Sequence, residues 1–265
     1  MTTTIEPTET AARAGLAEAL LCAIPASSRA FTTAIERLRA GRGAFALHET
    51  IGSARPALLA SLYRAMGGQV VVVVPTADVA ERTFADLLYY FGEPEPQSVS
   101  LLRSRDETVG AIESPSERSA RMTFFADALD GKPGIAIVPV AALRQYVMPH
   151  AVFSAERFAL KVGEDAGWDA TQKRLYRLGY ERADIVSAAG EFAVRGGILD
   201  VFAASADAPA RVEFFGDTVE SIRPFGLESQ RSEGERERLD IIPWSEIPRD
   251  EIYRTRAIER FTEPA

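Results

Sequence analysis

The hydrophobic residues between positions 43 and 148 form short continuous runs that alternate with longer stretches at helical spacing. The runs QVVVVVPT at 69–76 and GIAIVPVAAL at 134–143 are apolar without interruption, which is typical of strands buried on both faces of a parallel sheet. The stretch 77–92 between them has the apolar spacing of an amphipathic helix and ends in a glycine. This alternation predicts a doubly wound α/β layer structure.

Further elements are predicted on either side of these runs. The stretch 114–131 opens with a serine that is followed three positions later by a glutamate, which is the capping-box pattern of a helix N-terminus. A serine cap also opens a helix that ends at Gly41. The remaining elements predicted before residue 140 are helices at 9–24, 27–41 and 56–68 and short strands at 43–50 and 98–104.

The pattern changes near residue 155. A strand at 157–164 and a helix at 169–180, with Asp169 as its expected cap, are followed by short strands separated by Gly and Asp turns up to about residue 225. Such a segment is typical of an α+β module, and we expect it to be a separate domain. The rest of the sequence predicts a charged connector at 232–240, a strand with an exit loop at 240–248 and a helix at 249–265.

Composition narrows the possible classes of protein. The chain has 265 residues, of which 46% are hydrophobic and 26% charged, as in ordinary soluble globular proteins with one or two domains. Its net charge of −8 argues against nucleic-acid binding over the whole surface. Cys22 is its one cysteine, so no internal disulfide can form. The sequence has neither a membrane-spanning apolar stretch nor a signal-peptide pattern, so we expect a cytoplasmic location.

A phosphate-binding loop would be expected between the first strand and the helix that follows it. The pattern requires two glycines followed by Lys and Ser or Thr. Here Gly52 and Ser53 are present, but the second glycine and the Lys-Ser/Thr pair are missing, and Pro56 removes a backbone donor. We therefore expect a tight turn and a helix start, with a degenerate phosphate loop that binds no nucleotide.

Other catalytic and binding sites have weak support. His48 and His150 are the only histidines, and with one cysteine they exclude a Cys/His zinc site. No G-x-S-x-G elbow is present, so structural or surface histidines are favoured. From residue 157 to 231 there are 10 basic and 12 acidic residues, which disfavours DNA or RNA binding by the second module. We expect neither a metal nor a cofactor.

Strand alternation places unusual side chains on one face of this module. In ARVEFFGD, Val212 and Phe214 point to one face, while Arg211, Glu213 and Phe215 point to the other. The first pair suits a core, so an aromatic side chain is left among charged neighbours on the second face.

The segment GEFAVRGG shows the same division. Phe192 and Val194 share one face and Arg195 lies on the other, just before a Gly-Gly pair that indicates a bulge or tight bend. Two arginines and a phenylalanine are thus predicted together on an exposed sheet face, and these residue types are enriched at protein–protein hot spots. A solvated face with one stray aromatic is the alternative, and alternation does not distinguish the two.

Several motifs of the module resemble a known family. They are GYERADIV, GEFAVRGGILDVF, RVEFFGD, ESIRPF and SQRS, all between residues 179 and 232. They are similar to the N-terminal module of the bacterial transcription-repair coupling factor family (Mfd), and the excision-repair protein UvrB has a related module. The segment 220–232 is more similar to the coupling factors than to UvrB. The likeness is dense over 175–231 and looser elsewhere.

The resemblance implies a domain plan. Residues 1–155 would form a helicase-like, RecA-type α/β domain that has lost its nucleotide site, 156–243 an inserted UvrA-binding domain, and 244–265 the start of a return segment into the α/β domain. No tyrosine-rich insertion like the DNA-gripping hairpin of UvrB occurs between 100 and 135. The family protein continues into an RNA-polymerase-binding domain and a DNA translocase, so this chain resembles a truncated piece without them.

The resemblance also implies a binding site. The family's UvrA-contacting arginine in F-A-x-R-G matches Arg195, the arginine that opens R-[VL]-[DE]-F-F matches Arg211, and the second phenylalanine of that motif matches Phe215. Arg182 is a weaker neighbouring candidate. We expect a non-enzymatic module that recruits UvrA to stalled RNA polymerase, whereas polymerase and DNA would be bound through the missing domains. The alternatives are an ATP-dependent, UvrB-like DNA-binding subunit and a scaffold that contacts polymerase directly.

Overall fold

The computed structural model describes residues 28–41, 52–91, 98–105 and 113–249, together with the single positions 19, 21, 23, 24 and 46. The chain divides into two compact units, one formed by 1–105 with 130–145 and the other by 106–129 with 146–265. The predicted helices 9–24 and 249–265, the predicted strand 43–50, Cys22 and His48 lie wholly or almost wholly outside the described residues. The domain boundaries predicted at 155 and 243 remain predictions.

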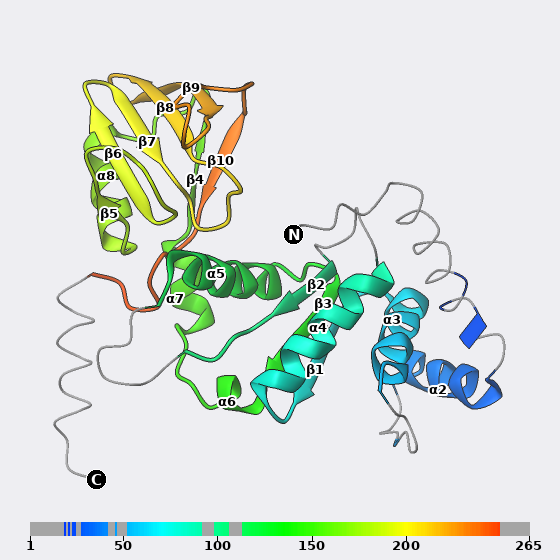
Figure 1. Ribbon diagram of the computed structural model, residues 1–265. Coiled ribbons are helices and arrows are strands. Elements are labelled where there is room, and N and C mark those ends of the chain that lie inside the picture. Colours follow the sequence, from blue (N-terminus) through cyan, green and yellow to red (C-terminus); the bar gives the residue numbers. More distant parts are fainter. Residues whose placement is uncertain are drawn as a thin grey trace, which may run out of the picture. The chain divides into compact units, whose positions relative to one another are not determined.

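A parallel sheet forms the centre of the first unit (Figure 1). Its strands are β1 (Gln69–Val74), β2 (Val99–Leu101) and β3 (Gly134–Pro139), and β3 lies between the other two. Helix α4 (Ala77–Phe91) connects β1 to β2 and packs against β2 and β3. This parallel β-α-β arrangement is the predicted α/β class. The run at 134–143 is a strand only as far as Pro139, because residues 140–143 form the short helix α6 (Val140–Leu143).

Two helices complete the described part of this unit. Helix α2 (Arg29–Arg39) begins with the predicted serine cap, because the Oγ of Ser28 accepts a hydrogen bond from the Phe31 amide at 3.2 Å. Helix α3 (Ala54–Met66) packs against α4. The core between these helices and the sheet consists of apolar side chains, among them Ala57, Ala60, Ala80, Leu87, Phe91, Ile135 and Ile137.

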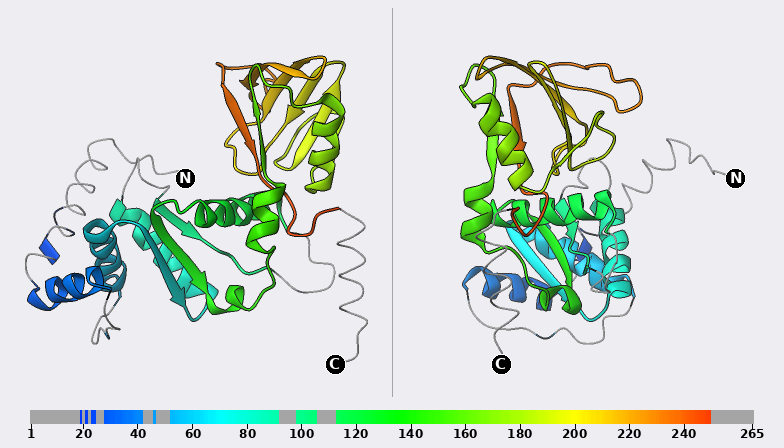
Figure 2. Two further views of the ribbon diagram at one scale, coloured as in Figure 1. Left: turned by 180° about the vertical axis from the view of Figure 1, so that it is seen from behind. Right: turned by 90° about the vertical axis from the view of Figure 1, so that its left-hand side faces the viewer.

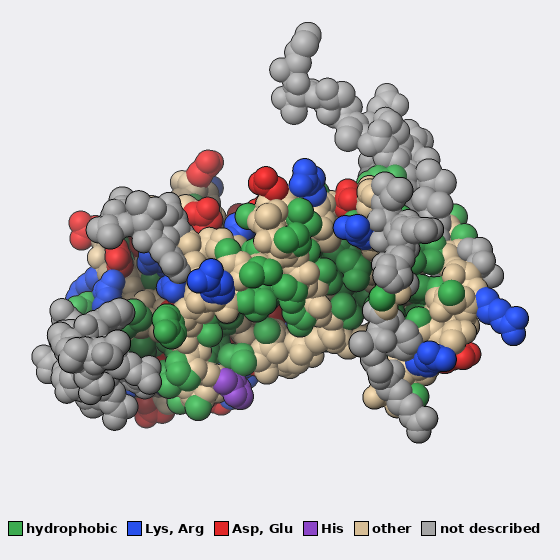
Figure 3. Space-filling view, turned by 90° about the horizontal axis from the view of Figure 1, so that it is seen from below, with side chains coloured by type: hydrophobic (Ala, Val, Ile, Leu, Met, Phe, Trp, Pro, Cys, Tyr) green, Lys and Arg blue, Asp and Glu red, His purple; other side chains and the backbone are tan. Residues whose placement is uncertain are grey.

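The prediction that the valine run is buried on both faces is wrong for β1. Val71 is 64% exposed and Val73 53%, whereas Val70 and Val72 pack against the core. Among the described strands β1 lies at the edge of the sheet. Figure 3 shows hydrophobic side chains gathered on the face of the molecule that carries β1 and α6. An uninterrupted valine run lacks the alternation that would reveal an open face, so this pattern could not distinguish the two cases.

The second unit contains a five-stranded sheet in the order β5-β6-β7-β8-β9. Its strands are β5 (Glu181–Arg182), β6 (Glu191–Arg195), β7 (Ile198–Val201), β8 (Ala210–Phe215) and β9 (Thr218–Pro224). All neighbouring pairs are antiparallel except β5 and β6. Helix α8 (Trp168–Arg177) lies along one face of the sheet (Figure 2), where Trp168 packs edge-on against Phe214 with ring centroids 5.1 Å apart. The short strands predicted up to residue 225 are therefore confirmed.

The remaining elements of this unit add buried side chains to the same core. Strands β4 (Phe158–Lys161) and β10 (Arg238–Ile241) form a separate antiparallel pair. Helices α5 (Pro115–Leu129) and α7 (His150–Glu156) also contribute buried side chains, such as Met122 and Phe153, to the same core. Helix α5, which lies between β2 and β3 in sequence, thus groups with the second unit.

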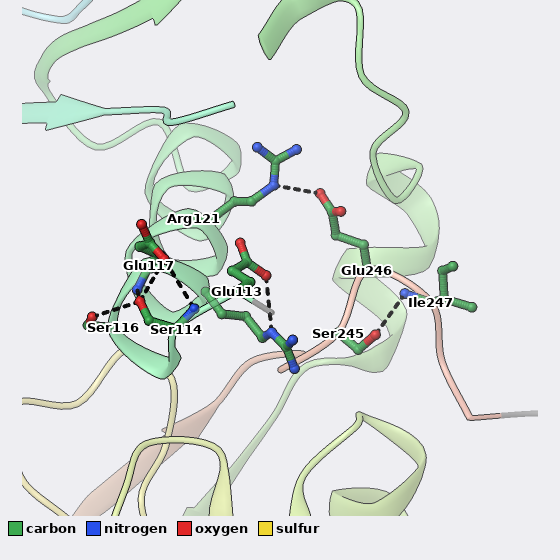
Figure 4. Close-up of polar contacts among 9 residues, drawn as sticks. Glu113, Ser114, Ser116, Glu117, Arg121, Ser245, Glu246 and Ile247 are labelled. Carbon is green, nitrogen blue, oxygen red and sulfur yellow. Dashed lines mark hydrogen bonds and ion pairs between the residues drawn. The ribbon is translucent and has the colours of Figure 1, made fainter. Parts of the chain in front are cut away.

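Of the two other predicted helix caps, one is confirmed and one is wrong. Ser114 and Glu117 form the predicted capping box of α5: the Ser114 amide donates to the Glu117 carboxylate at 3.1 Å, and the Glu117 amide donates to Ser114 Oγ at 3.2 Å (Figure 4). Asp169 is not the cap of α8, which begins one residue earlier. The Trp168 amide instead donates to the Asp217 carboxylate at 2.8 Å, because the turn after β8 supplies an acceptor from elsewhere in the chain.

Candidate interaction face

The strand register brings the predicted site residues onto one side of the five-stranded sheet. Phe192, Leu199 and Val212 point into the core and are buried. The alternate positions point the other way, and the register pairs Asp200 directly with Arg211. We call this outer surface the arginine face and define it by Arg195, Ile198, Asp200, Arg211, Glu213 and Phe215.

Arg211 is held rigidly on this face. Its Nε donates to Oδ1 of Asp200 at 2.7 Å and its Nη2 to Oδ2 at 2.8 Å, which is a bidentate pair. The guanidinium carbon also lies 5.0 Å from the ring centroid of Phe225. The hydrogen bonds with Asp200 raise the pKa of Arg211 above its ordinary value, against the opposing effect of burial. Arg211 is therefore a charged side chain with a fixed direction.

Arg195 is more accessible than Arg211. Its side chain is 54% exposed, and its Nη2 reaches Oδ2 of Asp200 only at 4.0 Å. It ends β6 at the predicted tight bend, where Gly196 has a φ of 59°. At Gly197 a Cβ atom would come within 2.9 Å of the Phe214 carbonyl oxygen, so the bend needs a glycine there to approach β8. The donors of Arg195 can thus reach a partner.

Phe215 is the apolar part of the face. It is the last residue of β8 and is 79% exposed, an unusual state for a large aromatic side chain. Ile198 is also exposed and lies in register between Arg195 and Glu213. Glu213 accepts a hydrogen bond from Ser221 Oγ at 2.8 Å, so its carboxylate is held as well.

The structure does not bring Arg182 to this face. Arg182 pairs in register with Phe192, whose side chain points into the core. Because paired residues share a face, Arg182 lies at the edge of the sheet on the side opposite the arginine face. Sequence reasoning missed Asp200 and Ile198. Alternation along ILDV would have placed both on the outer face, but the pairing of Asp200 with Arg211 follows only from the register of β7 and β8.

The other candidate sites are only partly described. Gly52 adopts a φ of 55°, Ser53 precedes α3 without a side-chain cap bond, and Pro56 is buried in the first turn. The Tyr90 hydroxyl donates to the Ser53 carbonyl oxygen at 3.3 Å. His150 is an exposed residue at the start of α7. Within the described ranges, no group of three His, Cys, Asp or Glu side chains could hold a metal ion.

Comparison with known proteins places the arginine face within a recognised domain. Residues 158–246 match the family model described as the UvrB interaction domain. The transcription-repair-coupling factor of Myxococcus xanthus is 34% identical over 235 residues, which cover 86% of this chain and 20% of that protein. That of Bacillus subtilis (strain 168) is 32% identical over 212 residues, which cover 79% and 18%. The chain thus spans about a fifth of the length of these curated relatives.

No helix in the described part of the chain is both long enough and apolar enough to cross a membrane.

Proposed function

We propose that this chain, a homologue of the transcription-repair-coupling factors that carries a UvrB interaction domain, is a non-catalytic docking module for UvrA. The arginine face would be the surface that UvrA contacts. In the whole protein this contact would recruit UvrA to a stalled RNA polymerase, while other parts of that protein would bind polymerase and DNA. The first unit would be a helicase-like domain that has lost its nucleotide site.

The observation that carries the proposal is the exposure of Phe215 beside an accessible arginine. The opposite side of the same sheet buries its apolar residues, so the sheet has enough core contacts without Phe215. Covering an exposed aromatic side chain with a partner removes apolar surface from water, which lowers the free energy of the complex. Arginine and aromatic residues together are the usual anchors of a protein interface.

The exposed arginine donors on this side of the sheet suit an acidic group of the partner. Arg195, Arg211 and Arg223 are arranged around the carboxylates of Asp200 and Glu213, and Glu235 also pairs with Arg223 at 4.0 Å, so the charges of this group balance. Arg195 offers the most accessible donors of the three, since its side chain is 54% exposed, against 39% for Arg223 and 23% for Arg211. Such local complementarity mainly gives an interface its orientation and specificity.

The direct test is the affinity of the purified chain for UvrA. We expect Arg195→Ala and Phe215→Ala each to weaken binding by about 1–3 kcal/mol, as at interface hot spots. The melting temperature should change little, because both side chains are largely exposed. Isothermal titration calorimetry with UvrA and thermal unfolding of each variant measure the two quantities.

Arg238→Ala is the matched control, since the Arg238 side chain is 53% exposed but belongs to β10 outside the five-stranded sheet. It should bind UvrA like the unchanged chain. Arg182→Ala should have a smaller effect than Arg195→Ala, because Arg182 lies on the other side of the sheet. Unchanged binding by an Arg195→Ala, Phe215→Ala double variant would show that the arginine face is not the contact surface.

A further inference from the structure

We propose that Asp200 is a positioning residue of the arginine face, which fixes Arg211 in place and leaves Arg195 as the arginine that pairs with an acidic group of the partner. This inference rests on the proposed function, and it assigns different tasks to two arginines that sequence motifs treat alike. Asp200 itself would make no contact with the partner.

The first support is the burial of Asp200. Its exposed fraction is 3%, although it lies on the side of the sheet that faces away from the main core. A buried carboxylate is costly unless it is paired and hydrogen-bonded. Arg211 supplies that pairing through both carboxylate oxygens. Asp200 therefore binds Arg211 in preference to water, and this contact persists without a partner.

The second support is the difference between the two arginines. The bidentate pair uses Nε and Nη2 of Arg211, and the ring of Phe225 limits its movement further. Only the rest of the guanidinium can face outward, in one direction. Arg195 has a single contact with Asp200, at 4.0 Å, and a mostly exposed side chain. A carboxylate of the partner can therefore form a two-pronged pair with Arg195 without displacing Asp200.

The sign of one substitution distinguishes positioning from simple attraction. If the face acted only through its net charge, Asp200→Asn would remove a negative charge beside two arginines and strengthen the binding of an acidic surface. If Asp200 positions Arg211, the same substitution frees the guanidinium to leave its bound direction, and binding weakens. The side chain of asparagine has nearly the same size, so shape contributes little to the difference.

The experiment measures UvrA affinity for Asp200→Asn, Arg211→Ala and the double variant at one fixed salt concentration. We expect Asp200→Asn to bind about tenfold more weakly, and to cause no further loss when Arg211 is already alanine. Equal or tighter binding by folded Asp200→Asn would overturn the inference. A loss of the same size in the Arg211→Ala background would also overturn it, because Asp200 would then act without Arg211.

Two further variants separate positioning from stability. Leu199→Ala removes a buried neighbour of Asp200 on the core side, so it should lower the melting temperature without changing the affinity of the folded protein. Arg211→Lys keeps the charge but cannot form the bidentate pair. It should bind UvrA about as weakly as Arg211→Ala, and it provides the test if Asp200→Asn does not fold. Arg211→Lys that binds like the unchanged chain would contradict positioning.

UvrA binding by the unchanged chain distinguishes a failure of the proposed function from a failure of the role assigned to Asp200. If the unchanged chain does not bind UvrA, the proposed function fails. If it binds and loses affinity with Arg195→Ala, while Asp200→Asn and Arg211→Lys bind normally, the proposed function holds and the role of Asp200 is refuted.

Discussion

Tyr180 shows how a single side chain connects distant parts of the second unit. It is fully buried, and its hydroxyl donates to the carbonyl oxygen of Ile242 at 3.0 Å and accepts from the amide of Ala204 at 3.0 Å. Its ring lies 6.2 Å from that of Trp244. One side chain thus provides the hydrogen-bond partner of two buried backbone groups. Without it, both groups would be desolvated and unpaired, which is costly.

Burial raises the pKa of the Tyr180 hydroxyl above its ordinary value of 10.0. The unfolded chain therefore loses this proton at a lower pH than the folded chain does. The resulting contribution to the free energy of unfolding is complete below about pH 10 and falls as the pH rises from there toward the raised pKa. We expect urea unfolding between pH 8 and 11 to show a steeper loss of stability in the unchanged chain than in Tyr180→Phe.

The same variant should cost about 1–3 kcal/mol at pH 7, because the Ala204 amide and the Ile242 carbonyl lose their partner. Tyr176→Phe is the control, since Tyr176 is an exposed tyrosine in the same unit and should leave both the slope and the stability unchanged. Identical slopes for Tyr180→Phe and the unchanged chain would exclude a pKa contribution from Tyr180.

At the scale of the element, the start of α3 bears on the ATP-dependent alternative. Nucleotide binding there would need backbone amides directed at the phosphates and a lysine near the terminal phosphate. Pro56 offers no amide in the first turn, and no lysine follows the glycine in this loop.

We therefore expect calorimetric titration with ATP and magnesium to give no saturable binding in the micromolar range. An intact P-loop ATPase titrated under the same conditions is the positive control. Saturable micromolar binding to this chain would favour the UvrB-like alternative and refute the degenerate loop.

At the scale of the whole molecule, α5 is attached to the chain that leaves β10. Arg121 and Glu246 lie 125 positions apart in sequence, and the Nε of Arg121 donates to Oε1 of Glu246 at 3.1 Å with both side chains almost fully buried (Figure 4). Next to this pair the guanidinium of Arg118 lies 5.5 Å from the ring of Trp244. These contacts explain why α5 groups with the second unit although its neighbours in sequence belong to the first.

Breaking this buried pair should destabilise the second unit. We expect Glu246→Gln to lower its free energy of unfolding by about 3–5 kcal/mol, because the substitution removes the carboxylate charge that pairs with the buried guanidinium of Arg121. Both tryptophans of the chain, Trp168 and Trp244, lie in this unit, so tryptophan fluorescence reports its unfolding.

Glu235→Gln is the matched control, since Glu235 forms an exposed pair with Arg223 at 4.0 Å. It should change stability by less than about 0.5 kcal/mol. Equal effects of the two glutamine substitutions would show that the buried pair contributes no more than a surface pair.

The amino-acid sequence was sufficient for features that depend on neighbouring residues. Alternation along β6 and β8 placed Arg195, Arg211 and Phe215 on the outer side of the sheet, because successive side chains of a strand point to opposite faces. The capping box of α5 was visible because its two partners are three positions apart. The motifs also identified the homologous family.

Features that depend on contacts between distant residues were decided by the folded chain. The register of β7 and β8 placed Asp200 beside Arg211, the turn after β8 supplied Asp217 to cap α8, and β1 was left with an open face. No local pattern encodes these contacts, since their free energy arises only when separate segments meet. In the five-stranded sheet the sequence therefore specified which side chains lie on the outer side, and tertiary packing determined which of them are held and which remain accessible.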